Sequence, residues 1–230
     1  MKLFHQSPED SYVAETEGHT IHSWARYYDM VLGILSLGRE KKFRQTALEL
    51  ASIEPGMNIL DVGCGTGSLS VAAKQNLGLD GRVVGIDPSS NMVNLAHQKA
   101  EEVDVEVDFQ VGVIESLEFD DNQFDLVLSS LMMHHLTDEL KVTGLQEVHR
   151  VLKPNGTLFI IELDPGAFSL ASLVHGHSAQ LSTELENTRR IMESLGFGPV
   201  ESGSVNFRGF SYLKGIKKIS DSPREIENGK

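Results

Sequence analysis

Residues 57–67 read Met-Asn-Ile-Leu-Asp-Val-Gly-Cys-Gly-Thr-Gly, and they indicate the fold more strongly than any other stretch of the chain. An apolar run with the length of a buried strand ends in three glycines at alternate positions, and a helical pattern follows over 68–75. Glycine lets backbone approach a ligand closely, and the free N–H groups at a helix start favour a negatively charged group. The stretch therefore predicts a strand, a glycine loop and a helix that bind a ligand, with a nucleoside cofactor as the expectation.

Length and charge narrow the class of protein. The chain has 230 residues and a formal net charge of −13, which suits one acidic domain with a single core and argues against nucleic acid as a partner. It has no run of eighteen apolar residues and no signal pattern at its start, so no transmembrane segment is expected. The single cysteine, Cys64, permits no intrachain disulfide, which fits a cytoplasmic protein. The sequence carries no signal of an oligomeric state.

Strands and helices are expected to alternate along most of the chain. Apolar runs and turn signals predict strands at 57–62, 82–87, 105–111, 124–129 and 156–163, with helices near 67–77, 90–102 and 137–152. A helix over about 180–195 and a pair of strands near 200–206 and 209–217 follow, and these two strands are close enough in sequence to pair antiparallel. The pattern predicts an α/β fold: a seven-stranded, mostly parallel, doubly wound sheet with an antiparallel C-terminal strand.

The organisation predicted for the chain is a lead, one domain and a tail. Residues 1–52 are expected to form the lead, with two helical segments that could serve as a lid, residues 53–218 the domain, and residues 219–230 a polar tail. In an open sheet of this kind, ligands bind beyond the carboxyl ends of the strands. The glycine loop follows the first predicted strand, so the cleft is expected there.

Two carboxylates are candidate ligand contacts. Asp87 ends the second predicted strand twenty positions after Gly67, where a carboxylate can accept hydrogen bonds from both ribose hydroxyls; helix capping is the alternative. Asp61 directly precedes the loop region and has two open roles, binding a cationic ligand end such as an ammonium or bonding the N–H groups of the loop. This acidic residue and the G-x-G-x-G spacing argue against a nicotinamide dinucleotide, whose loop has the spacing G-x-G-x-x-G.

Four motifs resemble those of class I S-adenosylmethionine-dependent methyltransferases. They lie at 60–67, 85–89, 124–130 and 147–158, in the order and at the spacing of that family. A narrower similarity, at 28–29 and 35–38, is to the ubiquinone/menaquinone-biosynthesis methyltransferases, which methylate a carbon of a quinol ring. The resemblance implies the Rossmann-like methyltransferase fold with lead helices, S-adenosyl-L-methionine as cofactor and S-adenosyl-L-homocysteine as product.

The resemblance also implies roles for individual residues. The loop passes close to the methionine part of the cofactor, the second carboxylate binds the ribose, the residues after it pack near adenine, and backbone after the fourth strand faces the amino group. The implied cofactor-binding residues are Asp61, Gly63, Cys64, Gly65, Gly67, Asp87, Pro88, Met92, Val113, Ile114 and Ser129. Cys64 is expected to be a small, partly buried loop residue and not a nucleophile, and Met92 fits ordinary core equally well.

One position departs from the family pattern. The family often has an acidic residue after the third strand that accepts a hydrogen bond from the adenine amino group, and Val113 stands there. Adenine would then rely on main-chain groups near Ile114 or on Glu115. A lost charge-assisted hydrogen bond costs on the order of 1.5–3 kcal/mol, so weaker cofactor binding is expected. Cofactor titration of a Val113→Asp variant tests this, because an unchanged dissociation constant would contradict it.

Catalytic candidates are expected beyond the fourth strand, at the methyl end of the cofactor. His134 has a pKa suited to general-base work, although ordering its loop is an equal alternative, and His135 is expected to order the loop. Glu162 and Asp164 could orient an acceptor, but termination of the fifth strand is favoured. Tyr28 is the second catalytic candidate, because the resemblance implies that it closes over the carboxylate end of the cofactor.

The predicted activity is methyl transfer to a small-molecule or lipid-like acceptor, with a quinol ring carbon as the first expectation. One alternative is an amine methyltransferase that acts on a phospholipid head group or a metabolite. The other is an S-adenosylmethionine-binding regulator without catalysis. No Cys/His spacing resembles a metal site, so no metal is expected.

Overall fold

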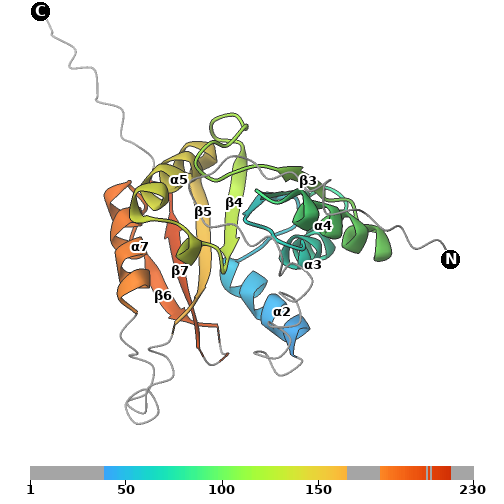
Figure 1. Cartoon of the computed structure of the whole chain (residues 1–230), viewed down its shortest axis with the longest axis horizontal. Coiled ribbons are helices and arrows are strands. Elements are labelled where there is room, and N and C mark those ends of the chain that lie inside the picture. The colour runs from blue at the N-terminus through green and yellow to red at the C-terminus, as the bar shows by residue number, and fades with distance from the viewer. Residues whose placement is uncertain (1–38, 165–181, 206, 208, 219–230) are drawn as a thin grey trace, which may run out of the picture.

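The computed structural model describes residues 39–164, 182–205, 207 and 209–218 (Figure 1). The first lead segment, including Tyr28, and the tail after 218 lie outside the described residues. The described part of the lead is helix α2 (Glu40–Ala51), which buries Phe43, Ala47 and Leu48 against the sheet, as its apolar spacing predicts.

A single seven-stranded sheet forms the centre of the fold, as predicted. Its order is β3-β2-β1-β4-β5-β7-β6, and the strands from β3 to β5 are parallel whereas β7 runs antiparallel to both β5 and β6. The strands are β1 (Asn58–Val62), β2 (Arg82–Asp87), β3 (Asp108–Val111), β4 (Phe124–Ser130), β5 (Leu152–Leu163), β6 (Glu201–Ser204) and β7 (Phe210–Ile216). The strand order reverses between β1 and β4, where such sheets bind ligands.

Helices cover both faces of the sheet (Figure 1). On one face α2, α3 (Ser68–Leu77) and α4 (Ser90–Glu102) pack in one hydrophobic cluster, and on the other α5 (Asp138–Val151) and α7 (Thr183–Ser194) pack in a second. Neighbouring residues of β1 divide between the clusters, since Ile59 belongs to the first and Leu60 to the second. This alternation is what a strand buried on both faces requires. Within the described residues, no helix is long and apolar enough to cross a membrane.

The fifth strand differs from the prediction. It begins at Leu152, four residues earlier than expected, because Leu152 pairs with Phe124 of β4 before the register shifts and Thr157 pairs with Leu126. Asn155 lies in the left-handed region, with a φ of 64°, inside this irregularity. Residues 153–156 (Lys-Pro-Asn-Gly) have the composition of a turn, but here they bend a strand that continues through them. The third strand is also shorter than predicted and begins at Asp108.

Candidate functional site

The glycine loop between β1 and α3 uses its three glycines in two ways. Gly63, Gly65 and Gly67 all have positive φ values, of 68°, 55° and 72°, which favour glycine. A Cβ atom at Gly63 would overlap the side chain of Met132, and one at Gly67 would lie 2.6 Å from the Phe109 ring. A Cβ at Gly65 would have no described atom within 4 Å. Two glycines therefore allow close packing, and the middle one leaves open space beside the loop.

Cys64 is a half-buried residue of this loop. Its backbone N–H donates to the carbonyl of Ile86 at 2.9 Å and so joins the loop to the end of β2. Burial raises the pKa of the thiol well above its ordinary value. A thiol that stays protonated is a poor nucleophile, so Cys64 has no expected chemical role.

Asp87 joins the loop to the start of α4. Its Oδ2 accepts a hydrogen bond from the N–H of Gly65 at 3.0 Å, and its Oδ1 accepts one from the N–H of Ser89 at 2.9 Å. Burial raises the pKa of Asp87, and these two hydrogen bonds oppose that shift. Capping of α4 is done by Ser89, whose Oγ accepts from the N–H of Met92 at 3.5 Å. The carboxylate of Asp87 is therefore fixed beside the open space at Gly65.

Asp61 is a buried carboxylate with a spare acceptor. It is 1% exposed, and its Oδ2 accepts a hydrogen bond of 2.5 Å from Ser70 Oγ on α3. Its Oδ1 has no hydrogen-bond partner among the described residues. Burial raises the pKa of Asp61 to about 7, and the charge of Asp87 adds to the shift. A buried acceptor without a donor costs free energy, so this atom fits the binding of a donor-bearing, cationic ligand group.

The chain turns sharply after β4. Ser129, which pairs with Val62 of β1, is 1% exposed, and its Oγ has no partner in the described part of the chain. Leu131 then adopts a φ of 57° and donates its N–H to the carbonyl of Ile161 at 2.8 Å. A branched residue rarely takes this conformation, and such strain gathers at functional sites. The turn brings Met132 onto Gly63, a contact that has no signal in the sequence.

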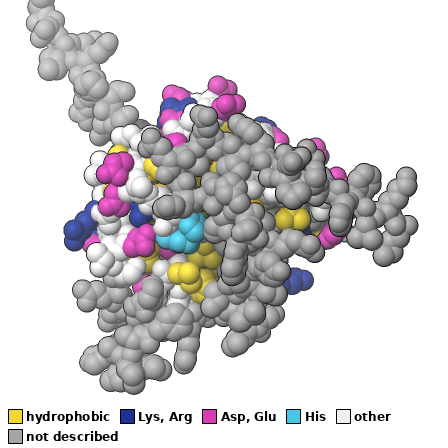
Figure 2. Space-filling view, in the orientation of Figure 1, with side chains coloured by type: hydrophobic (Ala, Val, Ile, Leu, Met, Phe, Trp, Pro, Cys, Tyr) yellow, Lys and Arg dark blue, Asp and Glu magenta, His cyan; other side chains and the backbone are white. Residues whose placement is uncertain are grey.

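A histidine–carboxylate pair follows this turn. His134 lies in a short 3-10 helix (Met133–His135), and its Nδ1 is 2.7 Å from Glu162 Oε2 of β5. The other oxygen of Glu162 accepts a hydrogen bond from the N–H of Met133 at 2.7 Å. The hydrogen bond with Glu162 raises the pKa of His134, whose side chain is 32% exposed. In the space-filling view, histidine side chains lie beside acidic and hydrophobic ones (Figure 2).

Residues 113–119 follow β3, where adenine is expected to bind, and a side chain of α5 contacts their backbone. Arg150 donates from its guanidinium to the backbone carbonyls of Leu117 and Phe119, at 2.9 and 2.7 Å. Within the segment, Ile114 is buried and Val113 is half-buried. Arg150 lies in the fourth motif, so the sequence marks the residue itself. It does not mark the partners of Arg150, which lie about thirty residues away in sequence.

Of the remaining predicted site residues, Pro88 and Met92 lie near Asp87, whereas Asp164 makes hydrogen bonds that connect elements of the fold. Pro88 is half-buried and lies between Asp87 and α4, and Met92, in the first turn of α4, is 6% exposed. Asp164 accepts from Ser211 Oγ at 2.7 Å and from the N–H of Ser182 at 3.3 Å, which ties β5 to β7 and to the start of α7. In the described ranges, no group of three His, Cys, Asp or Glu side chains is arranged to hold a metal.

Comparisons with known proteins agree with this geometry. Residues 59–156 match the family described as "Methyltransferase domain". The chain is 34% identical over 161 residues to the ubiquinone/menaquinone biosynthesis C-methyltransferase UbiE of Hydrogenovibrio crunogenus, over 69% of this chain and 62% of that protein. It is 35% identical over 136 residues to the demethylmenaquinone methyltransferase of Listeria welshimeri, over 59% of this chain and 57% of that protein. The chain thus spans less than two thirds of the length of these relatives.

The fold has solved counterparts. A SAM-dependent methyltransferase from Aquifex aeolicus superposes with a TM-score of 0.64 at 21% identity, over 82% of this chain and 97% of that one. A possible histamine N-methyltransferase from Thermotoga maritima gives 0.64 at 20% identity, over 87% of this chain and all of that one. The fold is therefore that of the S-adenosylmethionine-dependent methyltransferases. The match of residues 59–156 to a methyltransferase-domain family and the similarity to these relatives agree with the predicted resemblance to this class.

Proposed function

We propose that this protein transfers the methyl group of S-adenosylmethionine to a small or lipid-like acceptor, with a quinol ring carbon as the first candidate. The observation that carries the proposal is the group of ligand-binding features at the carboxyl end of β1. There the loop is open at Gly65, the fixed carboxylate of Asp87 lies beside it, and Asp61 holds a buried acceptor without a partner in the described structure. The single free cysteine suits a reducing compartment such as the cytoplasm.

The described residues fit the cofactor by their chemistry. The second lone pairs of the Asp87 carboxylate can accept from ribose hydroxyls while its present hydrogen bonds stay in place. The spare Oδ1 of Asp61 suits the ammonium of the methionine part, together with the backbone at Ser129. Pro88, Met92 and the 113–114 segment are the candidates for packing against adenine. When bound, the cofactor supplies an electrophilic methyl group on a sulfonium.

The short helix Met133–His135, here called the histidine turn, favours an acceptor that must lose a proton. A carbon or oxygen acceptor needs a base, whereas a neutral amine does not need one before it attacks. His134 is partly exposed and held by Glu162, so it can serve as that base. The names of the two curated relatives, a quinone-biosynthesis C-methyltransferase and a demethylmenaquinone methyltransferase, agree with a carbon acceptor. We therefore prefer quinol methylation to the amine alternative.

Calorimetry with S-adenosylhomocysteine tests cofactor binding. The wild type should bind, and Asp87→Ala should bind at least tenfold more weakly because the ribose contact is lost. Asp80→Ala is the matched control, since Asp80 is an exposed carboxylate between α3 and β2, outside the proposed site. No binding by the wild type at millimolar ligand would overturn the proposal.

Labelled methyl transfer tests catalysis. The protein is incubated with methyl-labelled S-adenosylmethionine and demethylmenaquinone that has been reduced to the quinol in detergent micelles. Label in the lipid phase supports a quinol acceptor. Label that enters only water-soluble products of a cell extract would move the acceptor to another class, and binding without any transfer would favour the non-catalytic regulator.

A further inference from the structure

Glu162 stands out because both of its oxygens are used by the same turn. It is 5% exposed, and it accepts from the N–H of Met133 while it pairs with Nδ1 of His134, each at 2.7 Å. The contact follows from the sheet, since Ser130 at the end of β4 pairs with Ile161 of β5. Glu162 is the next residue of β5, so it lies close to the turn that follows β4. A carboxylate that only ended a strand would not need two partners on a neighbouring loop.

We propose that Glu162 is the positioning residue that fixes the tautomer and orientation of His134, so that His134 Nε2 becomes the catalytic base for a carbon or oxygen acceptor. The inference rests on the proposed function. The Nδ1 atom must carry hydrogen to donate to the carboxylate, which leaves the lone pair of neutral imidazole on Nε2. A second carboxylate bond, from the N–H of Met133, holds the backbone next to His134, while the Nδ1 contact holds the ring itself.

The proton and electron movements balance for a quinol. The hydroxyl proton of the acceptor passes to His134 Nε2, the ring carbon forms its bond to the methyl group, and the sulfur–methyl bond breaks with its electron pair left on sulfur. The ring C–H proton then leaves while the oxygen is reprotonated, which restores the aromatic ring and its hydroxyl. One proton is released for each methyl group transferred. The carboxylate of Glu162, paired with Nδ1, stabilises the imidazolium that forms.

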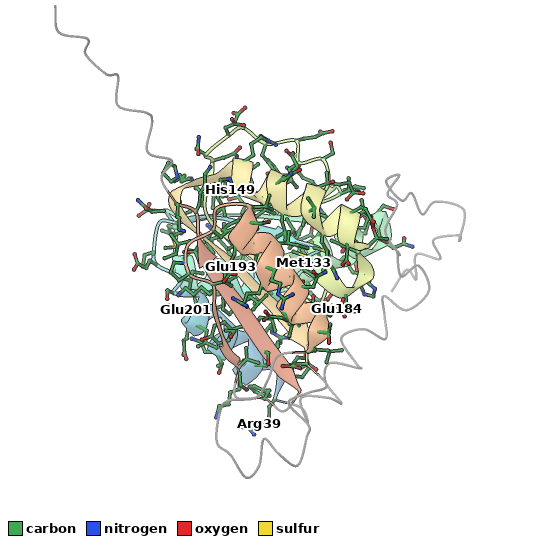
Figure 3. All side chains as sticks on the ribbon, turned by 90° about the vertical axis from the view of Figure 1, so that its left-hand side faces the viewer. Arg39, Met133, His149, Glu184, Glu193 and Glu201 are labelled. Carbon is green, nitrogen blue, oxygen red and sulfur yellow. The ribbon has the colours of Figure 1, made fainter. Side chains whose placement is uncertain are left out.

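Other charged groups face the same ring. Glu184, at the start of α7, favours the protonated ring, and Lys141 of α5 opposes it. These two side chains pair with each other at 3.1 Å. His135 lies in the same turn, with its ring centroid 4.0 Å from that of His134. Met133 and Glu184 mark the turn and the helix in Figure 3. Glu162 is the charged group that hydrogen-bonds the ring, and this contact is the largest cause of the raised pKa of His134.

Nuclear magnetic resonance of histidine-labelled protein tests the pairing without any acceptor. The His134 signals are assigned with a His134→Asn variant, and their pH titration gives the midpoint and the tautomer. Glu162→Gln should lower the midpoint by about one pH unit or more, because the charge that favours imidazolium is gone, and should mix the two tautomers. Glu162→Asp should restore part of the shift. Glu184→Gln is the matched control, since it removes a facing charge that makes no hydrogen bond to the ring, and its shift should be smaller.

Turnover gives the second readout. The acid limb of the rate against pH for quinol methylation should move to lower pH in Glu162→Gln by the same amount as the midpoint. His134→Asn should lose about 10²–10⁴-fold in turnover while S-adenosylhomocysteine binds as in the wild type. Unchanged midpoint and tautomer in Glu162→Gln, or full turnover in His134→Asn, would overturn the inference. Failure of the proposed function appears separately, as absence of S-adenosylhomocysteine binding in the wild type.

Discussion

Replacement of Asp61 by asparagine should stabilise the protein at neutral and higher pH and weaken its cofactor binding. The carboxylate is 1% exposed, and its Oδ1 has no donor in the described structure. The unliganded protein therefore bears the cost of ionising a buried group. An asparagine side chain has nearly the same shape and can still accept the hydrogen bond from Ser70, but it does not ionise.

The size of the effect follows from the pKa of Asp61, which burial raises from 3.8 to about 7. Each pH unit between these values is worth about 1.36 kcal/mol, so ionisation costs the folded protein about 4 kcal/mol. Because the folded pKa is raised, the cost is absent below pH 3.8, grows as pH rises, and is complete above pH 7. The unpaired amide of asparagine offsets about 1–3 kcal/mol of the gain. We expect Asp61→Asn to be about 1–3 kcal/mol more stable than the wild type at about pH 8 and less stable at about pH 4.

Urea denaturation followed by circular dichroism at about pH 4.5, 6 and 8 measures this difference. Comparison of the two proteins at each pH removes the contribution of titrating groups that do not interact with Asp61. Asp80→Asn, which changes an exposed carboxylate, should follow the wild type at all three values. A free-energy difference between Asp61→Asn and wild type that stays constant with pH would refute the reasoning. Calorimetry at the highest pH should show at least a tenfold loss of S-adenosylhomocysteine affinity, and unchanged affinity would remove Asp61 from the ligand site.

Other substitutions test the loop and its supports. Gly67→Ala should cost about 2–5 kcal/mol in urea denaturation, because its φ is 72° and its Cβ would lie 2.6 Å from Phe109; a cost below about 1 kcal/mol would contradict the packing. Gly65→Ala should cost only about 1–2 kcal/mol but lower S-adenosylhomocysteine affinity in calorimetry, and unchanged affinity would show that no ligand uses the open space. Asp87→Ala should lose about 1–3 kcal/mol by leaving two N–H groups unpaired, and an unchanged urea midpoint would refute this. Arg150→Met should lower the free energy of unfolding by a similar amount and weaken cofactor binding. Unchanged stability and unchanged cofactor binding would contradict the idea that Arg150 supports the segment after β3.

The fold is largely predictable because its signals are local. Short apolar runs, the glycine loop and the turn signals define β1, β2, β4 and their helices within a few residues of the structure. The order of the strands in the sheet is not predictable from local signals, because it depends on which surfaces pack together when the chain collapses. Adjacency in sequence predicts that β6 and β7 pair, which they do, but nothing local indicates that β7 lies between β5 and β6.

The site is predictable in its parts but not in its contacts. The sequence identifies Asp61, but its partner Ser70 depends on the exact phase of α3. The pairing of His134 with Glu162 joins a residue that follows β4 to one near the end of β5, so it depends on the order of the strands in the sheet. The left-handed conformation of Leu131 has no signal at all, because its sequence suits a strand and only the tertiary structure imposes the turn.

The contact of Met132 with Gly63 has a consequence for engineering this protein. The side chain of Met132 occupies the space where any residue other than glycine at position 63 would place its Cβ atom. The packing of one loop therefore depends on the other. A mutant library that varies the turn to accept new substrates would also alter cofactor affinity, unless Met132 is held constant.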